Sequence, residues 1–287
     1  MFIIYVNDLG IDIGNNMAKF ADDTKISGVS TKYENCLALQ SDLDKITKWC
    51  ENWDMSLNYE KCTSLHIGNN NVNFTYTMND KLLNKAIEQK DLGVIIDNKL
   101  KFSKHCKESS KKANKILGLV SRSFEHKSKD IILPLYKSLV RPHLEYASQF
   151  WNPHYRKDID VLERVQKRAT KQIPSVRNLP YSERLRALKI HSLETRRLRG
   201  QLIEVYKIIN GFDLLGDNIL TVDRNSITRN NGLKLKGKRF HTDVAKNFFA
   251  NRVINEWNKL PHEVVHALSI NSFKNRLDKY FHICNIW

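Results

Sequence analysis

Phe20-Ala21-Asp22-Asp23 places two adjacent carboxylates between two strand-like segments. Residues 17–21 are typical of a short strand, and residues 24–29 alternate as a return strand would. The pattern predicts a tight hairpin with Asp22 and Asp23 at its tip, because Asp tolerates the backbone angles that a two-residue turn demands.

The two carboxylates indicate a chemistry as well as a turn. Side by side they repel each other, and a hard divalent cation removes that repulsion. Mg²⁺ takes one or two protein carboxylates and completes its shell with water and substrate phosphates, which suits a nucleotidyl-transfer site that works with two metals. Asp-Asp is also good turn chemistry at a solvated tip, so these residues alone leave both interpretations open.

Further segments, in order along the chain, carry a family resemblance. They are Phe2-Ile3-Ile4-Tyr5-Val6-Asn7-Asp8-Leu9, Lys19-Phe20-Ala21-Asp22-Asp23-Thr24 and residues 91–97, 135–146, 164–171, 202–207, 253–261 and 272–277. Together they resemble the reverse transcriptases of non-LTR (LINE-type) retrotransposons, jockey-like in character. The resemblance spans nearly the whole chain, whereas Phe-Ala-Asp-Asp by itself would be a weak motif.

The resemblance implies an α+β fold. It implies part of a reverse transcriptase palm over 1–100, a mainly helical thumb over 101–175, and a helical C-terminal extension over 176–287 with a basic linker near 211–240. In that family the palm begins earlier, with a further metal-binding Asp, and fingers precede it; residues 1–4 resemble the end of a palm helix. We therefore expect a C-terminal fragment, a truncated copy or a partial reading frame, that is inactive alone.

The resemblance also implies roles for individual residues. Asp22 and Asp23 would be the catalytic, Mg²⁺-binding pair, with Asp22 the stronger ligand. Lys61 would approach the incoming nucleoside triphosphate, or else lie on a solvated strand edge. Gly93 would belong to a primer-grip strand in which nucleic-acid backbone approaches closely, or else mark a plain bulge.

Charge points independently to a polyanionic partner. Lys and Arg number 47 against 31 acidic residues, a formal net charge of +16, which favours nucleic acid over an anionic membrane. Amphipathic helices are expected over 103–124 and around 159–169, and the first resembles a thumb helix that grips a template–primer duplex. A basic helix face is otherwise merely solvated. The expected nucleic-acid contacts are Lys107, Lys111, Lys115, Arg164, Lys167, Arg168 and Lys171.

The expected partners are therefore an RNA template, a DNA primer and, in the full-length enzyme, deoxynucleoside triphosphates. No membrane is expected, because no run approaches the roughly 20 apolar residues of a span. Five cysteines without paired spacing favour a reduced intracellular setting, nucleus or cytoplasmic ribonucleoprotein, with no targeting signal. Two alternatives remain open: a non-catalytic nucleic-acid-binding remnant, and a pseudogene product that does not fold stably.

Periodicity places the remaining elements. An apolar stripe, from Cys36 to Trp53, predicts a helix over about 32–55, packed behind the hairpin. Strands at 62–67 and 73–78 are expected to form a hairpin around the turn at 69–71. Further helices are expected over 130–151, with Pro134 in its first turn, from the cap Ser192 to the stop Gly211, and over 242–259 and 271–282.

His262-Glu263-Val264-Val265-His266 matches the H-E-x-x-H pattern of zinc metalloproteases. That chemistry needs both histidines on a long helix with a third ligand, whereas Pro261 and Ser269 enclose only a short segment here. We therefore interpret the motif as a connecting turn.

Overall fold

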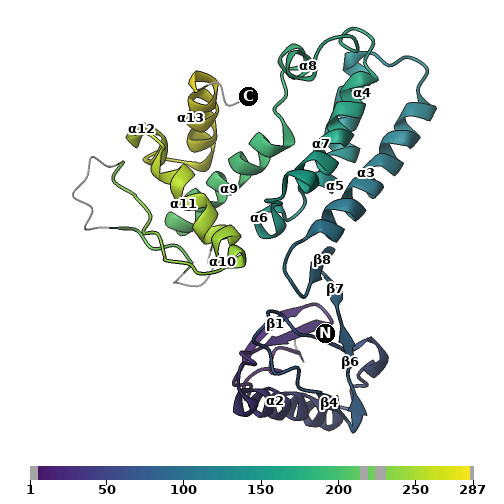
Figure 1. The fold of residues 1–287 in the computed structure, drawn as a ribbon, viewed down its shortest axis with the longest axis vertical. Coiled ribbons are helices and arrows are strands. Elements are labelled where there is room, and N and C mark those ends of the chain that lie inside the picture. The colour runs from purple at the N-terminus through teal and green to yellow at the C-terminus, as the bar shows by residue number, and fades with distance from the viewer. Residues whose placement is uncertain (1–5, 214–218, 224–230, 285–287) are drawn as a thin grey trace. The chain divides into compact units, whose positions relative to one another are not determined.

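The computed structural model describes residues 6–213, 219–223 and 231–284. The chain divides into two compact units, Met1–Leu100 and Lys101–Trp287 (Figure 1). The described elements mix helix and strand, which is compatible with an α+β fold. Within the described residues, no helix is both long enough and apolar enough to cross a membrane. The helix end expected at residues 1–4 lies outside the described residues.

From residue 16 onward, the described part of the first unit contains one long helix, a short 3₁₀ turn and four separate pairs of strands. Its elements are β1 (Asn16–Phe20), β2 (Asp23–Ser27), α2 (Tyr33–Asn52), η1 (Tyr59–Lys61), β3 (Thr63–Leu65), β4 (Thr77–Met78), β5 (Lys81–Leu82), β6 (Asn84–Ala86), β7 (Glu88–Asp91) and β8 (Val94–Asp97). The antiparallel pairs are β1–β2, β4–β5 and β7–β8, and β3 pairs with β6 in parallel.

Helix α2 supplies the core of this unit, as its apolar spacing predicts. Cys36, Ile46 and Cys50 are buried in one cluster, and Met17 of β1 and Ile26 of β2 pack against it. The stripe ends earlier than expected, because the helix stops at Asn52 and the side chain of the next residue, Trp53, is 46% exposed. Packing on α2 therefore supports the hairpin from one side.

The hairpin expected around residues 69–71 is wrong. β3 pairs with β6, and β4 turns back at once into β5 through Asn79 and Asp80. Both of these residues have positive φ, 49° and 59°, the conformation that a tight turn requires and that Asn and Asp adopt most readily. The tight turn at residues 79–80 pairs β4 with β5. β4 therefore does not pair with β3, contrary to the prediction from the sequence pattern.

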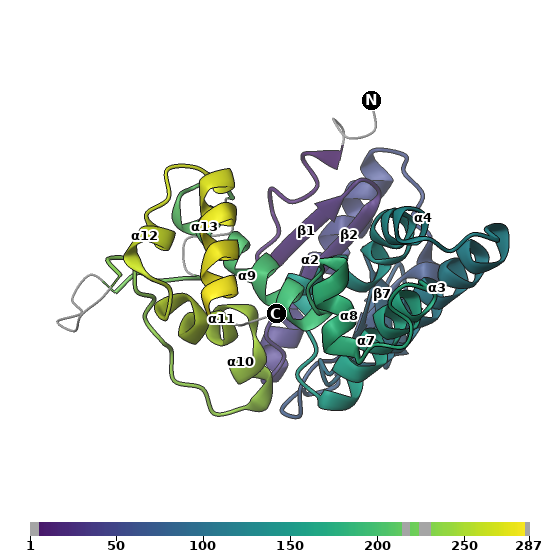
Figure 2. The ribbon, with the colours of Figure 1, turned by 90° about the horizontal axis from the view of Figure 1, so that it is seen from above.

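The second unit is helical. Its elements are α3 (Ser103–Ser123), α4 (Lys129–Leu135), the π-helical turn η2 (Tyr136–Val140), α5 (Pro142–Glu145), α6 (Ser148–Trp151), α7 (Arg156–Lys171), α8 (Tyr181–Leu188), α9 (Leu193–Ile209), α10 (Asp243–Asn247), α11 (Phe249–Asn258), α12 (His262–Val265) and α13 (Ile270–Ile283). Helices α3 and α7 lie side by side in both ribbon views (Figures 1 and 2), with Ser103 Oγ donating to Asp158 Oδ2 at 2.5 Å.

The single helix expected over 130–151 is broken into four pieces, and Pro134 lies inside α4 rather than in its first turn. Proline has no N–H to donate to the preceding turn, and the chain widens directly afterwards into the π-helical turn. A second break falls at Ala147, whose φ is 51°. The helix expected over 242–259 is likewise divided, at Phe248.

The residues predicted to begin and end helix α9, Ser192 and Gly211, are confirmed. Ser192 Oγ accepts the backbone N–H of Thr195 at 3.1 Å, which satisfies one of the free donors of the first turn. Gly211, with a φ of 72°, follows the last helical residues, as a left-handed stop requires.

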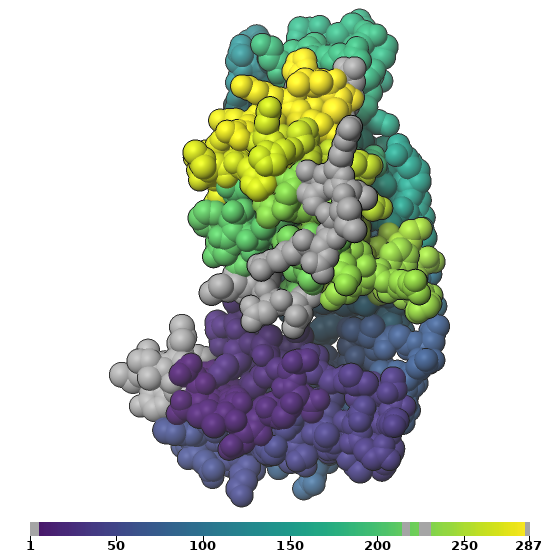
Figure 3. Space-filling model, turned by 90° about the vertical axis from the view of Figure 1, so that its left-hand side faces the viewer, coloured from purple at the N-terminus to yellow at the C-terminus, as the bar shows by residue number. Residues whose placement is uncertain are grey.

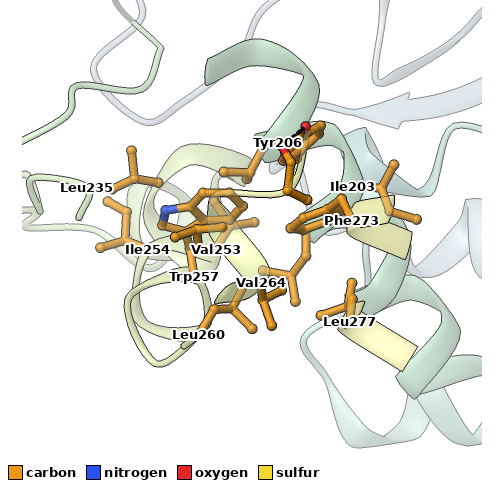
Figure 4. Packing of buried hydrophobic residues seen from close by; sticks show 14 of the residues in the cluster. Ile203, Tyr206, Leu235, Val253, Ile254, Trp257, Leu260, Val264, Phe273 and Leu277 are labelled. Carbon is orange, nitrogen blue, oxygen red and sulfur yellow. Dashed lines mark hydrogen bonds between the residues drawn. The ribbon is translucent and has the colours of Figure 1, made fainter. Parts of the chain in front are cut away.

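The C-terminal core gathers around two aromatic residues (Figure 4). Trp257 and Phe273 are fully buried and stack with ring centroids 5.9 Å apart. Trp257 Nε1 donates to the carbonyl oxygen of Leu233 at 2.7 Å, and the Tyr206 hydroxyl donates to that of Ala267 at 2.7 Å. Both polar atoms are thus satisfied inside the apolar cluster, which Figure 4 shows between α9, α11 and α13.

The region near 211–240 is only partly described, because residues 214–218 and 224–230 of that prediction lie outside the described residues. Val222 and Leu235 form an antiparallel bridge. The side-chain amide of Asn258 bonds both to the N–H of Leu235, at 2.8 Å, and to its carbonyl oxygen, at 3.0 Å. Leu235 is therefore attached to α11 and is part of the core.

Candidate functional site

The hairpin that carries the Asp pair is present, with its turn one residue earlier than predicted. Phe20 pairs with Asp23, so the loop residues are Ala21 and Asp22, and Asp23 begins β2. The positive φ, 52°, belongs to Ala21 rather than to an Asp. The register follows from packing: Met17 lies opposite Ile26, and both face the core, whereas a one-residue slip would turn them outward.

Both carboxylates are accessible. Asp22 and Asp23 are exposed, and the space-filling view shows the early, purple part of the chain at the surface of the first unit (Figure 3). Oxygen donors of this kind fit Mg²⁺, which takes one or two carboxylates and fills its shell with water and phosphate oxygens. Among the described residues, no group of three or more His, Cys, Asp or Glu is placed to hold a metal. The Asp pair by itself offers two carboxylates to such an ion.

Asp42 of α2 holds the chain that leads into the hairpin. Its buried carboxylate accepts the backbone N–H of Gly14 at 3.2 Å, and both the backbone N–H and the side-chain amide of Asn15, at 2.9 and 2.8 Å. Lys45 Nζ lies 3.1 Å away. Burial alone would raise the pKa of Asp42, but the hydrogen bonds from Asn15, Gly14 and Lys45 outweigh it and lower the pKa to about 2. The sequence carries no motif for this anchor.

Two surface contacts also involve the hairpin. Lys19 Nζ on β1 donates to the carbonyl oxygens of Val6 and Asn7, each at 2.8 Å. Lys25 on β2 forms an ion pair with Asp91 on β7. Its lysine side chain is 56% exposed, so water screens the pair and its contribution to stability is small.

Gly93 does not lie within a strand. It is the second residue of the two-residue turn between β7 and β8, where Asp91 pairs with Val94. Leu92 and Gly93 both have positive φ, 43° and 86°, which is the requirement of a type I′ hairpin turn. Gly93 therefore lies in a hairpin turn, neither within a strand nor at a bulge, and its contact with nucleic acid stays a prediction.

Lys61 is exposed at the end of the short 3₁₀ turn η1, directly before β3. Its backbone N–H donates to the side chain of Asn58 at 3.3 Å. This geometry leaves the ammonium group accessible, and its role with nucleotides stays a prediction.

The predicted basic residues lie on the outer faces of α3 and α7. Lys107, Lys111 and Lys115 are exposed on α3, opposite the buried side that includes Ala113 and Leu117. Lys111 Nζ lies 2.6 Å from Glu108, an exposed ion pair that reduces the free charge at this position. On α7, Arg164, Arg168 and Lys171 are exposed and Lys167 is half-buried.

A basic pocket that the sequence did not indicate lies where α7 meets α8. It has a volume of about 500 Å³ and is lined by Lys167, Arg168, Lys171, Gln172 and Arg184. Three of these residues are among the predicted nucleic-acid contacts, while Arg184 comes from the next helix. The available signal was the one-turn spacing of Tyr181 and Arg184 in a short amphipathic helix, which is too common to identify a site.

Comparison with known proteins connects these features to a family. The chain is 27% identical over 165 residues to "RNA-directed DNA polymerase from mobile element jockey" of Drosophila melanogaster, covering 55% of this chain. It is 29% identical over 208 residues to the protein of the same name from Drosophila funebris, covering 67% of this chain. The chain is similar to the RNA-directed DNA polymerases of jockey mobile elements. The resemblance predicted from the sequence is confirmed.

This jockey-like chain matches only part of each polymerase. The aligned regions cover 18% and 21% of the two relatives, so the chain spans about a fifth of their length. An uncharacterized protein of Caenorhabditis elegans is 29% identical over 124 residues, which cover 42% of this chain and 63% of that protein. No protein-family model matches the chain. No solved structure matches it either.

Proposed function

We propose that this chain is a portion of an RNA-directed DNA polymerase that carries two of the metal-binding carboxylates, Asp22 and Asp23, and a helical nucleic-acid-binding unit. The similarity to two jockey RNA-directed DNA polymerases carries the proposal. The exposed Asp pair on a hairpin anchored to α2 supports it. Residues 1–100 would be part of the palm, residues 101–175 the thumb, and residues 176–287 a helical extension.

In this proposal the two carboxylates supply oxygen ligands that would hold Mg²⁺ for an incoming deoxynucleoside triphosphate. When bound, Mg²⁺ would neutralise negative charge on the attacking and leaving oxygens of the nucleotidyl transfer. Met17 and Ile26, packed on α2, keep the two strands in register, so that Asp22 stays in the turn and Asp23 at the start of β2. Lys61 contributes a positive charge for the triphosphate from its exposed position.

The helical unit would bind the RNA template and DNA primer. Lys107, Lys111 and Lys115 on α3 and the basic residues of α7 neutralise backbone phosphates, a contact that does not depend on sequence. The net charge of +16 supports this assignment.

For the isolated chain, nucleic-acid binding without catalysis is the second proposal, favoured by one observation. Asp22 and Asp23 have no third described carboxylate, Cys or His grouped with them, and nucleotidyl transfer depends on the complete set of positioned charges. Loss of a single preorganised electrostatic group typically costs about 10²–10³ in rate. The isolated chain should therefore bind a duplex but extend no primer.

The decisive experiment places this chain in the corresponding part of a jockey polymerase and measures primer extension on an RNA template. We expect Asp22→Asn to reduce the rate by about 10² or more, because it removes charge and keeps shape. The matched control is Asp80→Asn, since Asp80 is also exposed in a tight turn, between β4 and β5. Full activity of Asp22→Asn would refute the metal-binding role, and primer extension by the isolated chain would refute its inactivity.

A further inference from the structure

The pocket between α7 and α8 concentrates positive charge without acidic lining. Three of its lining residues belong to the last turns of α7, and Arg184 approaches from α8. Four cations and one amide, Gln172, line an open depression of about 500 Å³. Basic residues in the last turn of a helix are favoured by the helix dipole, which accounts for Arg168 and Lys171. It does not account for Arg184, which belongs to a different helix.

Arg184 is the unusual member of this group. Its side chain is buried, with 8% of the residue exposed. Its guanidinium bonds only to neutral oxygens: Nε donates to Thr170 Oγ1 at 3.2 Å, and a terminal nitrogen donates to the carbonyl oxygen of Leu179 at 3.0 Å. Among the described residues it forms no ion pair. Buried arginines are almost always paired with an anion, so the pocket lacks the negative charge that its geometry calls for.

An aromatic ring holds two of these cations in place. Lys167 Nζ lies 5.2 Å from the centroid of the Tyr181 ring, and the Arg184 guanidinium carbon lies 5.5 Å from it. The ring is itself fixed, because the Tyr181 hydroxyl donates to Glu163 and accepts from Gln166 Nε2 at 2.9 Å. The ring face therefore positions both cations. The Glu163 carboxylate behind the ring offsets part of the Lys167 charge, whereas Arg184 has only neutral hydrogen-bond acceptors.

We propose that this pocket binds a phosphate group and that, in the complex with nucleic acid, it holds one phosphodiester of the backbone. The proposal rests on the proposed nucleic-acid binding of the helical unit and assigns it a specific contact point. Arg184 offers the planar donor geometry that matches phosphate oxygens. Lys171 and Arg168, at the exposed rim, add charge that attracts the backbone. Because the cations are already positioned, little side-chain entropy is lost on binding.

The test uses the whole chain and a fluorescein-labelled RNA–DNA duplex, with affinity measured by fluorescence anisotropy across a salt series. Lys171→Gln removes one charge at the pocket, and Lys157→Gln removes one exposed charge at the other end of α7. We expect Lys171→Gln to weaken binding about tenfold and to reduce the log–log salt slope by about 1. Lys157→Gln should change the affinity much less. Arg184→Lys keeps the positive charge but removes the planar guanidinium donors, so it should also weaken binding. Thermal unfolding checks that this variant is folded.

The backbone contact is tested with a duplex in which alternate phosphodiesters are replaced by neutral methylphosphonates. The unmodified chain should lose more affinity on this duplex than Lys171→Gln does, because the variant already lacks one of the phosphate contacts. Duplex binding that is equal in Lys171→Gln and Lys157→Gln would overturn the pocket proposal and leave the proposed function standing. No duplex binding by the unmodified chain would overturn both.

A separate arm measures calorimetric titration with inorganic phosphate. Heat that Lys171→Gln abolishes, together with unchanged duplex affinity in the same variant, would assign the pocket to free phosphate and refute the backbone contact. If Lys171→Gln loses both the heat of phosphate binding and duplex affinity, the result would support the backbone contact.

Discussion

Replacing Asp42 with asparagine tests whether a distant carboxylate on α2 holds the Asp22–Asp23 hairpin in place. In the native protein this carboxylate accepts three hydrogen bonds from Gly14 and Asn15, the residues that lead into β1. Asparagine has nearly the same shape but no charge, and its NH₂ group cannot accept. The substitution should therefore loosen the start of β1 while leaving the apolar side of α2 unchanged.

The magnitude follows from the pKa. Folding lowers the pKa of Asp42 from its ordinary value of 3.8 to about 2. A tenfold change in a proton-binding constant is worth about 1.4 kcal/mol, so ionised Asp42 contributes about 2 kcal/mol of stability at pH 7. Because the folded pKa is the lower one, this contribution is present above pH 4 and is lost as pH falls through 2. At pH 3 it should be roughly half its value at neutral pH.

The assay is urea-dependent hydrogen exchange of peptides from residues 16–27, read by mass spectrometry, which separates this unit from the helices after residue 100. Asp42→Asn should lower the free energy of opening by about 2 kcal/mol at pH 7, and by about half of that at pH 3. The matched control is Asp44→Asn, because Asp44 lies on the same helix but is exposed; it should change the free energy by less than about 0.5 kcal/mol.

A difference between Asp42→Asn and the native chain that stays equal at pH 7 and pH 3 would refute the electrostatic explanation. Equal effects of Asp42→Asn and Asp44→Asn would refute the anchoring role altogether.

Three further predictions concern the basic face, a turn and a helix interior. Duplex affinity should fall by about a hundredfold or more between 50 and 200 mM salt if four to six phosphates are neutralised, and reversing the charges of Lys111 and Lys115 should weaken all duplex sequences alike; unchanged affinity in an anisotropy titration would mean that the face is only solvated. Gly93→Ala should destabilise the first unit by about 1 kcal/mol, because φ is 86° there. Gly118→Ala inside α3, where a Cβ meets nothing closer than 3.7 Å, should stabilise its unit by up to about 1 kcal/mol; the same sign for both substitutions in urea unfolding would contradict this reasoning.

The long helices could be predicted because their signals are local. The 3–4 spacing from Cys36 to Cys50 predicts α2, and the same periodicity predicts α3 and α7. The end signals of α9, Ser192 and Gly211, act on backbone groups within one turn of themselves. Such interactions form wherever the segment lies, so the sequence contains them in full.

Pairing between strands that are distant in the sequence could not be predicted in the same way. β3 runs parallel to β6, about twenty residues further along the chain, and nothing within either three-residue strand specifies that partner. The turns were misplaced for a related reason: positive φ at Asn79, Asp80 and Leu92 depends on which strands close across them. The π-helical turn after Pro134 shows the same limit, because a missing N–H does not specify how the chain compensates.

The features of the candidate sites can be separated in the same way, into those that the local sequence predicts and those that depend on tertiary contacts. Asp22 and Asp23 are adjacent in the covalent chain, so the sequence by itself determined the pair of carboxylates, the hairpin that carries it and the excess of basic residues on two amphipathic helices. Only the tertiary structure decided the register that makes Asp22 a turn residue and Asp23 the start of β2, because packing of Met17 and Ile26 on α2 selects one of the possible alignments. It also decided that Asp42 anchors the hairpin across 27 residues of sequence, and that Arg184 joins Lys167 at one aromatic ring. Contacts of that kind depend on burial and on the meeting of separate helices, which no local pattern records.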